Sequence, residues 1–182
     1  LMMSCGGHGR PPITGTVRPV ALPVGTNSTK HLAPKAEDSK KAIKSELQRT
    51  DDVIEYLGYS VSYNKDRKIP NWVSYELLAS ETDGPYSRKG KNFRQDPSLR
   101  LPQAEDNDYR NSGWSRGHMA PAGDFKWSDK AMWDTFYFTN CCPQNQSLNA
   151  GQWNTLEQKV RDWAKRFGKV HVVTGPIIGK NI

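Results

Sequence analysis

The sequence has 182 residues, of which 35% are hydrophobic and 25% are charged, a balance typical of a globular domain. It contains no run of about 18 apolar residues, which excludes a membrane-spanning helix. Lys and Arg outnumber Asp and Glu by 26 to 19, giving a net charge of +7. This excess favours a polyanionic partner such as nucleic acid, an acidic glycan or an anionic membrane.

The first residues, LMMSCGG, resemble the end of a bacterial lipoprotein signal, in which the cysteine (here Cys5) becomes lipidated. The stretch up to about residue 35 is rich in Pro, Gly, Thr and Ser, which is typical of a linker. We therefore expect residues 1–50 to be a signal-peptide remnant and flexible arm, and residues 51–182 to be the folded domain. The same interpretation predicts a bacterial cell-envelope or secreted protein, with membrane anchoring through Cys5.

The next elements are a weak helix, a hairpin and a basic loop. A helical pattern covers 39–56 only poorly. Residues 59–63 alternate with period two, and a turn separates them from a second strand-like run at 71–80, which together predict a β-hairpin. Residues 84–100 carry five cations against a single acid, with Gly, Pro and Ser, and are expected to form a basic loop.

The second half alternates helices and strands. Ser128 is a candidate N-cap of a short helix, and residues 136–139 read as a buried strand. A helix is predicted over 152–167, with Gly168 as its C-cap, and a strand over 169–175. The helix has an apolar stripe at helical spacing, made of Trp153, Leu156, Val160, Trp163, Ala164 and Phe167.

This order predicts a mixed α+β fold. The chain stops soon after its last core strand, so we expect an exposed sheet edge and further residues in a longer protein. The adjacent Cys141 and Cys142 are not expected to bond each other, because a disulfide between neighbours is strained. They are expected to be small buried residues, or one of them pairs with a partner elsewhere.

The stretch SRGHMAPAGDF, residues 115–125, places His118 two residues after Arg116. It is either a surface turn or a site in which His118 accepts a proton and Arg116 holds an anion. Further along, Glu157 and Arg161 are four residues apart on the predicted helix and share a face. Taken alone, they are typical of a surface ion pair.

Asn140 and Asn149 lie in the segment between these two groups and, individually, are common turn residues. Taken together, however, the histidine, arginines, asparagines and glutamate fit metal-assisted phosphodiester hydrolysis. That reaction needs a base for water, a hard cation, and cationic side chains on the phosphate oxygens.

Several ordered blocks, SRGHMAPAGDF, TNCCPQNQSLNAGQWNTLE and VVTGP, resemble the DNA/RNA non-specific endonucleases. These are the ββα-metal, or His-Me finger, nucleases of the endonuclease G type. The resemblance covers about residue 59 to the end. It implies a ββα-metal α+β fold with a central, mainly antiparallel sheet flanked by helices. It also implies one Mg²⁺ or Mn²⁺ ion, cleavage of both DNA and RNA, and 5′-phosphate products.

The resemblance also implies roles for matching residues. His118 matches the general base, Asn149 the sole direct metal ligand, and Glu157 an acid that holds the metal through water. Asn140 matches an asparagine that orients the base or the substrate. Ser115 departs from the family motif, which usually has Asp there, and this replaces a negative charge near the metal by a hydroxyl. We expect an altered metal affinity or rate and no loss of the reaction.

The remaining matched residues are cations. Arg116 and Arg161 match arginines that contact phosphate. In the basic loop the position of the phosphate-binding residue is ambiguous, and Arg88 is favoured over Lys91 because a planar guanidinium forks onto phosphate. The loop as a whole is expected to contact the backbone through Arg88, Lys91 and Arg94, without reading bases.

Two alternatives remain open. One is a phosphodiesterase of the same fold that acts on small nucleotides. The other is a non-catalytic, basic nucleic-acid-binding lipoprotein, which would need the cations but not the histidine, asparagine and glutamate.

Overall fold

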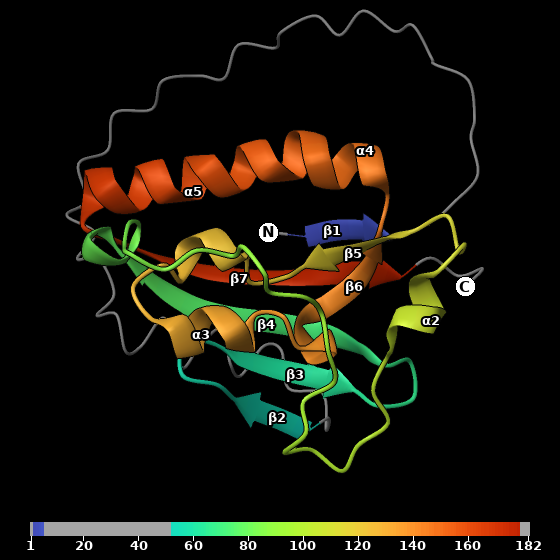
Figure 1. Cartoon of the computed structure of the whole chain (residues 1–182). Helices are drawn as coiled ribbons and strands as arrows, with labels where there is room; N and C mark the ends of the chain where they lie inside the picture. The colour runs from blue at the N-terminus through green and yellow to red at the C-terminus, as the bar shows by residue number, and fades with distance from the viewer. Residues whose placement is uncertain (1, 6–51, 179–182) are drawn as a thin grey trace, which may run out of the picture. The chain divides into compact units, whose positions relative to one another are not determined.

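The structure, a computed structural model, describes residues 2–5 and 52–178, with side chains from Val53 onward (Figure 1). Its main sheet has five strands in the order β1-β7-β4-β3-β2. These are β1 (Met2–Cys5), β2 (Asp52–Glu55), β3 (Ser60–Asn64), β4 (Ile69–Leu78) and β7 (Lys169–Ile178). β1 is parallel to β7, and the other neighbouring strands are antiparallel. The predicted α+β fold with a mainly antiparallel sheet is confirmed.

The chain also forms a smaller, two-stranded sheet and, after it, a long helix. β5 (Ser115–His118) pairs antiparallel with β6 (Cys141–Gln144). After β6 come α4 (Gln146–Leu148), a π-helical turn (Asn149–Trp153) and α5 (Asn154–Phe167). The other helical elements are short: α2 (Asp106–Tyr109), α3 (Asp129–Asp134), and 3₁₀ turns at Ala79–Glu81, Ala122–Asp124 and Phe138–Asn140.

The core lies over one face of the main sheet. Along β4, Val73, Tyr75 and Leu77 alternate onto this face, as expected for a strand with one face buried. α5 packs against β4 and β7 from this side through Val160 and Ala164, as Figure 1 shows. The segments that follow β5 complete the core, which therefore joins the sheet, the motif segment and α5 in one cluster.

Three local predictions are confirmed. β3 and β4 form the expected hairpin. Ser128 caps α3, its Oγ accepting a hydrogen bond from the backbone N–H of Ala131 at 3.2 Å. α5 ends at Gly168, whose φ of +86° suits a residue without a Cβ.

The predicted apolar stripe of α5 is only partly buried. Val160 and Ala164 are buried, and so is Trp153 in the preceding π-turn, but Trp163 is 42% exposed and Phe167 is 66% exposed. Trp163 and Phe167 lie in the same uninterrupted helix as Val160 and Ala164, so the buried face of α5 is narrower than the predicted stripe.

Three local predictions are wrong. Residues 52–55 form a strand, not the end of a helix, and residues up to 51 of that predicted helix lie outside the described part. The strand predicted at 136–139 is instead a turn with a 3₁₀ helix. The strand comes just after it, at β6, in residues expected to form a loop, because these residues pair with β5.

The N-terminal residues also differ from expectation. Met2–Cys5, expected in a signal remnant, forms β1, and β7 therefore has strands on both sides where an exposed edge was predicted. Residues 6–51 of the predicted arm lie outside the described part, and the division at residue 50 stays a prediction. In the described residues no helix is both long and apolar enough to cross a membrane.

Cys141 and Cys142 are buried as expected. The Sγ of Cys141 donates a hydrogen bond to the Tyr109 hydroxyl at 3.5 Å, and burial raises the pKa of this thiol to about 12. It is therefore a packed core thiol and not a reactive thiolate.

Candidate active site

The motif residues are presented by the pairing of β5 with β6. Arg116 lies opposite Pro143, Gly117 opposite Cys142, and His118 opposite Cys141. A Cβ built on Gly117 would come within 2.2 Å of the Gln144 Oε1 atom. The glycine between the arginine and the histidine is thus explained by close approach of the two strands.

His118 is buried and held by aromatic rings. Its ring centre lies 4.5 Å from that of Phe93 and 4.9 Å from that of Phe136, the latter at 90°. Its Nε2 is buried without a hydrogen-bond partner. Burial and, secondarily, the nearby Arg88 charge lower the pKa of His118 to about 3. The imidazole is therefore neutral at physiological pH, which is the form that accepts a proton.

Asn140 supports the backbone next to this histidine. Its Oδ1 accepts from the Ala120 N–H at 2.8 Å, and its Nδ2 donates to the carbonyls of Ala120 and Thr135, both at 2.9 Å. Its own carbonyl accepts from the Met119 N–H at 3.0 Å. The amide is fully buried and committed to the backbone, so the geometry favours a positioning role and not contact with substrate.

A cavity of about 240 Å³ brings most of the predicted site residues together. They come from separate segments: the basic loop, β5, the π-turn and α5. The wall also includes the short turn that follows the histidine. The predicted residues that line it are Arg88, Arg116, His118, Asn149 and Glu157.

Three residues line this cavity with side-chain oxygens that suit a hard cation: Asn149 and Glu157, which were predicted, and Asn154, which was not. Burial, and then the negative charge of Asp124, raise the pKa of Glu157 to about 7. In the described residues no group of three or more His, Cys, Asp or Glu side chains could hold a metal. A cation here would therefore have few direct protein ligands and keep most of its waters, as Mg²⁺ commonly does.

Arg161 pairs with a carboxylate that sequence reasoning missed. Its Nη1 donates to Asp124 Oδ1 at 2.6 Å, and Tyr75 donates its hydroxyl proton to Asp124 Oδ2 at 2.7 Å. The Asp124 side chain is fully buried, and burial raises its pKa. The Arg161 guanidinium packs over Gly123, which lines the cavity, so it borders the cavity from behind this residue.

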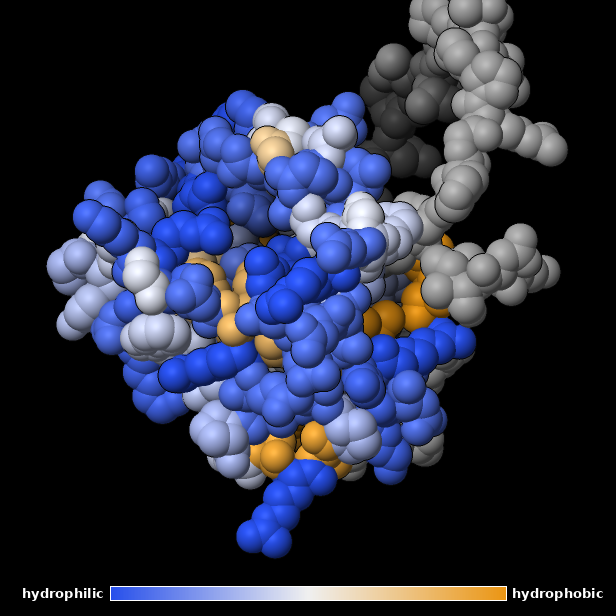
Figure 2. Space-filling model, turned by 45° about the vertical axis from the view of Figure 1, so that its right-hand side comes forward, coloured by the Kyte–Doolittle hydropathy of each residue, from blue (hydrophilic) through white to orange (hydrophobic). Residues whose placement is uncertain are grey.

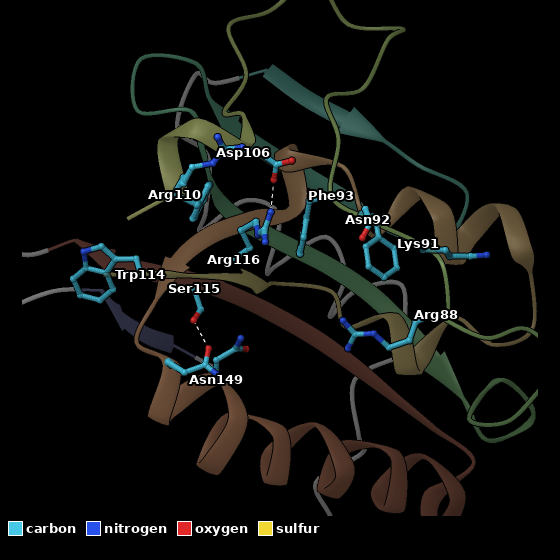
Figure 3. Close-up of a pocket in the computed structure, with 13 residues that line it drawn as sticks. Arg88, Lys91, Asn92, Phe93, Asp106, Arg110, Trp114, Ser115, Arg116 and Asn149 are labelled. Carbon is cyan, nitrogen blue, oxygen red and sulfur yellow. Dashed lines mark hydrogen bonds and ion pairs between the residues drawn. The ribbon is translucent and has the colours of Figure 1, made fainter. Parts of the chain in front are cut away.

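Two motif residues are more exposed. Arg116 forms an ion pair with Asp106 of α2, and its guanidinium lies 5.9 Å from the Phe93 ring centre. Ser115 donates its hydroxyl proton to Gln146 Oε1 at the start of α4. Figure 3 shows the two side chains pointing in opposite directions from β5, Arg116 toward Asp106 and α2, and Ser115 toward the start of α4. Ser115 is thus tied to the helix that leads to Asn149.

The three cations of the basic loop have different surroundings. Arg88 lines the 240 Å³ cavity and lies 5.7 Å from the Phe136 ring centre. Lys91 is largely buried and forms an ion pair with Asp129 at 2.7 Å. Arg94 lies outside the cavity, with its guanidinium 4.5 Å from the centre of a Trp133 ring. Of the two candidates for the phosphate, the surroundings favour Arg88.

The chain is similar to several nucleases. It is 41% identical over 147 residues to the mitochondrial nuclease EXOG of Xenopus laevis, an alignment that covers 80% of this chain and 41% of the relative. It is 38% identical over 120 residues to human mitochondrial endonuclease G, an alignment that covers 65% of this chain and 40% of the relative. The chain therefore spans about two fifths of the length of these relatives.

A solved structure is similar as well. It is described as a crystal structure of the EndoG/EndoGI complex showing the mechanism of EndoG inhibition. The match has a TM-score of 0.69 and 34% sequence identity, and it covers 80% of this chain and 61% of the other. At this identity and score the two share a fold that includes the ββα arrangement of β5, β6 and α5.

The predicted bacterial cell-envelope or secreted location is wrong. The EXOG and endonuclease G relatives are named as mitochondrial nucleases and come from vertebrates. Their likeness to this chain points away from a bacterial lipoprotein. The short N-terminal block around Cys5 was too little sequence to identify a lipoprotein signal.

The family assignment rests on most of the chain. The family model for DNA/RNA non-specific endonucleases matches residues 38–182. The match includes the motif with His118, the strand β6 that pairs with it, and α5 with Glu157. This chain belongs to the DNA/RNA non-specific endonuclease family.

Proposed function

We propose that this chain hydrolyses phosphodiester bonds of both DNA and RNA, without strong sequence preference, and leaves 5′-phosphate ends. The observation that carries the proposal is the 240 Å³ cavity, which gathers a neutral buried histidine, two arginines and the side-chain oxygens of Asn149, Asn154 and Glu157. The family and the names of its relatives, which are nucleases and endonucleases, support it.

His118 acts as the base. Its neutral imidazole accepts a proton from a water molecule, and the water oxygen attacks phosphorus. The bond from phosphorus to the 3′ oxygen then breaks, and this oxygen takes a proton from solvent. The His118 ring is held in place by the rings of Phe93 and Phe136. The backbone just after His118 is held by hydrogen bonds from Met119 and Ala120 to Asn140.

Arg88 and Arg116 bind the non-bridging oxygens of the phosphate. Both line the cavity beside the histidine, and a guanidinium forks onto phosphate oxygens. Arg116 exchanges its exposed partner Asp106 for the phosphate, a small loss because such exposed pairs contribute about 0–1 kcal/mol. Arg161, behind Gly123, adds positive charge from the side of α5.

One divalent ion, Mg²⁺ or Mn²⁺, fits the cavity, with Asn149 as its direct ligand and Glu157 holding it through water. A divalent ion there supplies positive charge to the phosphate and to the leaving oxygen. The raised pKa of Glu157 supports this placement, because a buried carboxylate with too little positive charge around it gains from a nearby cation.

A plasmid-nicking assay tests the proposal. The protein should convert supercoiled plasmid to nicked and linear forms with Mg²⁺ or Mn²⁺, degrade RNA in the same buffer, and lose both activities in EDTA. Equal nicking with and without EDTA would contradict the metal role. Cleavage of dinucleotides but not of plasmid or long RNA would instead support a phosphodiesterase of small nucleotides.

A mitochondrial setting follows from the names of the vertebrate relatives. Imaging of the tagged full-length protein in its own cells, together with a mitochondrial marker, tests it. A tag that stays outside mitochondria would contradict this part of the proposal without affecting the activity.

A further inference from the structure

A second, larger cavity of about 600 Å³ adjoins the catalytic one and shares Arg88, Arg116 and Asn149 with it. Its volume falls in the range of about 300–1,000 Å³ that is typical of ligand sites. Its charged wall residues are mostly cations, Arg88, Lys91, Arg110 and Arg116, opposed by Asp106. Such a wall suits an anionic chain that continues from the scissile phosphate.

The far end of this cavity carries an indole. In Figure 3, Trp114 lies on the opposite side of Arg116 from Arg88 and Lys91. Trp114 is 36% exposed, so part of its indole is open to solvent at this groove. In Figure 2 the visible face of the molecule is mostly hydrophilic, with small apolar patches.

The backbone of Trp114 is held in place by a tight turn. Its N–H donates to Ser112 Oγ at 3.0 Å, and Ser112 Oγ donates to the Tyr109 carbonyl at 2.8 Å. Asn111 and Gly113 both have positive φ, +57° and +80°, which fits a tight reversal between α2 and β5. The indole therefore starts from an ordered backbone and not from a long free loop.

The other aromatic rings of this cavity are already used. Phe93 and Tyr109 each stack on Phe138, at interplanar angles of 28° and 16°, and Phe136 packs edge-on against His118 at 90°. Among the rings in the described part of the chain, none contacts Trp114. The exposed part of the indole is therefore not covered by another ring and is available to a planar ligand.

Arg110 adds a cation at the same end. Its side chain is exposed and forms no ion pair with any residue of the described segments, whereas Arg116 is paired with Asp106 and Lys91 with Asp129. In Figure 3 Arg110 lies above Trp114 on the same side of the cavity. Both residues line this cavity, so Arg110 offers a phosphate contact and Trp114 a stacking surface along the same groove.

We propose that Trp114 stacks on an unpaired base of the nucleic-acid substrate, while Arg110 binds a phosphate of the same strand. This inference rests on the proposed nuclease function. Trp114 precedes His118 by four residues, about 13 Å along an extended strand, so the stacked base lies beyond the nucleotide being cut. Bases inside a duplex are covered by their neighbours, so this contact favours single-stranded, frayed or gapped nucleic acid. Stacking uses the base face alone and does not distinguish DNA from RNA.

The test compares two strands with equal numbers of phosphates: a fluorescent oligothymidylate and an abasic strand of the same length. Binding is measured by fluorescence anisotropy with the His118→Ala protein, which prevents cleavage. Adding Trp114→Ala should weaken oligothymidylate binding by about 5- to 150-fold, the range found for loss of one base–aromatic stack. Binding of the abasic strand should not change.

Two further variants control for structure. Trp114→Phe keeps an aromatic face and should restore most of the oligothymidylate affinity. Trp163→Ala removes another exposed tryptophan, on α5 and outside this cavity, and should affect neither strand. Unchanged melting temperatures exclude misfolding as the cause.

The outcomes separate the two proposals. Equal loss on both strands, or no loss on oligothymidylate, would overturn the stacking site, even if the wild-type protein nicks plasmid in Mg²⁺. If the wild-type protein neither binds the strands nor nicks plasmid, the nuclease proposal itself fails. As an independent readout, Trp114→Ala should lower kcat/KM on single strands more than on blunt duplex.

Discussion

Replacing Arg161 by methionine should destabilise the protein through Asp124. The Asp124 carboxylate is fully buried, and the Arg161 side chain is only 18% exposed. The two form the 2.6 Å contact described above, and Tyr75 donates to the other carboxylate oxygen. Arg161→Met leaves this carboxylate without a cation, and the Tyr75 hydroxyl remains as its side-chain hydrogen-bond donor among the described residues.

The size of the effect follows from the burial. Breaking a buried ion pair by removing one partner commonly costs about 3–5 kcal/mol, because the other charge stays buried and uncompensated. We expect the lower end, about 3 kcal/mol, since Tyr75 still donates and the carboxylate, whose pKa burial already raises, can take up a proton. Adding Asp124→Asn removes that charge while keeping an oxygen for Tyr75. The double variant should therefore be more stable than Arg161→Met by at least about 1 kcal/mol.

Urea denaturation followed by tryptophan fluorescence measures these free energies of unfolding. Arg166→Met is the matched control. Arg166 is exposed on the same helix, with its guanidinium 5.2 Å from the Phe167 ring centre, so its replacement should change the free energy of unfolding by no more than about 0.5 kcal/mol. A loss below about 1 kcal/mol for Arg161→Met, at an unchanged m-value, would refute the reasoning. So would a double variant less stable than the single one. Activity of the folded double variant then reports separately on the predicted phosphate contact of Arg161.

Four other results are expected. His118→Ala should lower plasmid nicking by about 10²–10⁴-fold and leave binding nearly intact, whereas His171→Ala, on β7, should do neither; near-normal turnover would exclude His118 as the base. Asn149→Ala should lose activity that extra Mg²⁺ or Mn²⁺ partly restores, and a loss insensitive to metal would contradict the ligand role. Arg88→Ala should flatten the slope of log affinity against log salt by about one unit on any duplex, whereas Arg94→Ala should not, and equal slopes would contradict the difference. The pKa of His118 is about 3 in the folded protein, below its unfolded value of about 6.5, so its contribution to stability is fully present above pH 6.5. As the pH falls from 6.5 toward 3, the free energy of unfolding should decrease by up to about 1.4 kcal/mol per pH unit from this residue alone. In urea titrations over this pH range, His118→Ala should therefore lose less stability than the wild-type protein.

Elements with a strong local pattern were predictable. The α5 periodicity and the alternation in β3 and β4 reflect burial of one face, and burial of one face is visible in a short stretch of sequence. β5 and β6 have no such signal. They are four residues each, SRGH and CCPQ, and their pairing joins Ser115 to Gln144 across a long segment of chain. Only that long-range contact makes them strands.

The residues of the candidate site likewise differ in how far the sequence predicts them. His118 and Arg116 are recognisable because the chemistry sits in one short motif. Asp124 is in the same quoted stretch, but a single carboxylate gives no sign that it will be buried or which cation will reach it. Trp114 was missed for a related reason, since a tryptophan in a Gly/Ser turn looks like any partly exposed aromatic residue until its neighbours are known.

Glu157 and Arg161 show what helical spacing can and cannot predict. Four residues apart, they share a face of α5 as expected, and the simplest expectation was a surface pair with each other. In the structure Arg161 instead forms its ion pair with Asp124, because a fully buried carboxylate is stabilised more by a guanidinium than a partly exposed carboxylate is. Glu157 is left without an ion-pair partner among the described residues, facing the cavity that holds His118, and its pKa rises to about 7. The Arg161–Asp124 pair thus leaves the Glu157 carboxylate, whose charge Arg161 and Arg88 offset only in part, at the point where the proposed reaction requires a cation.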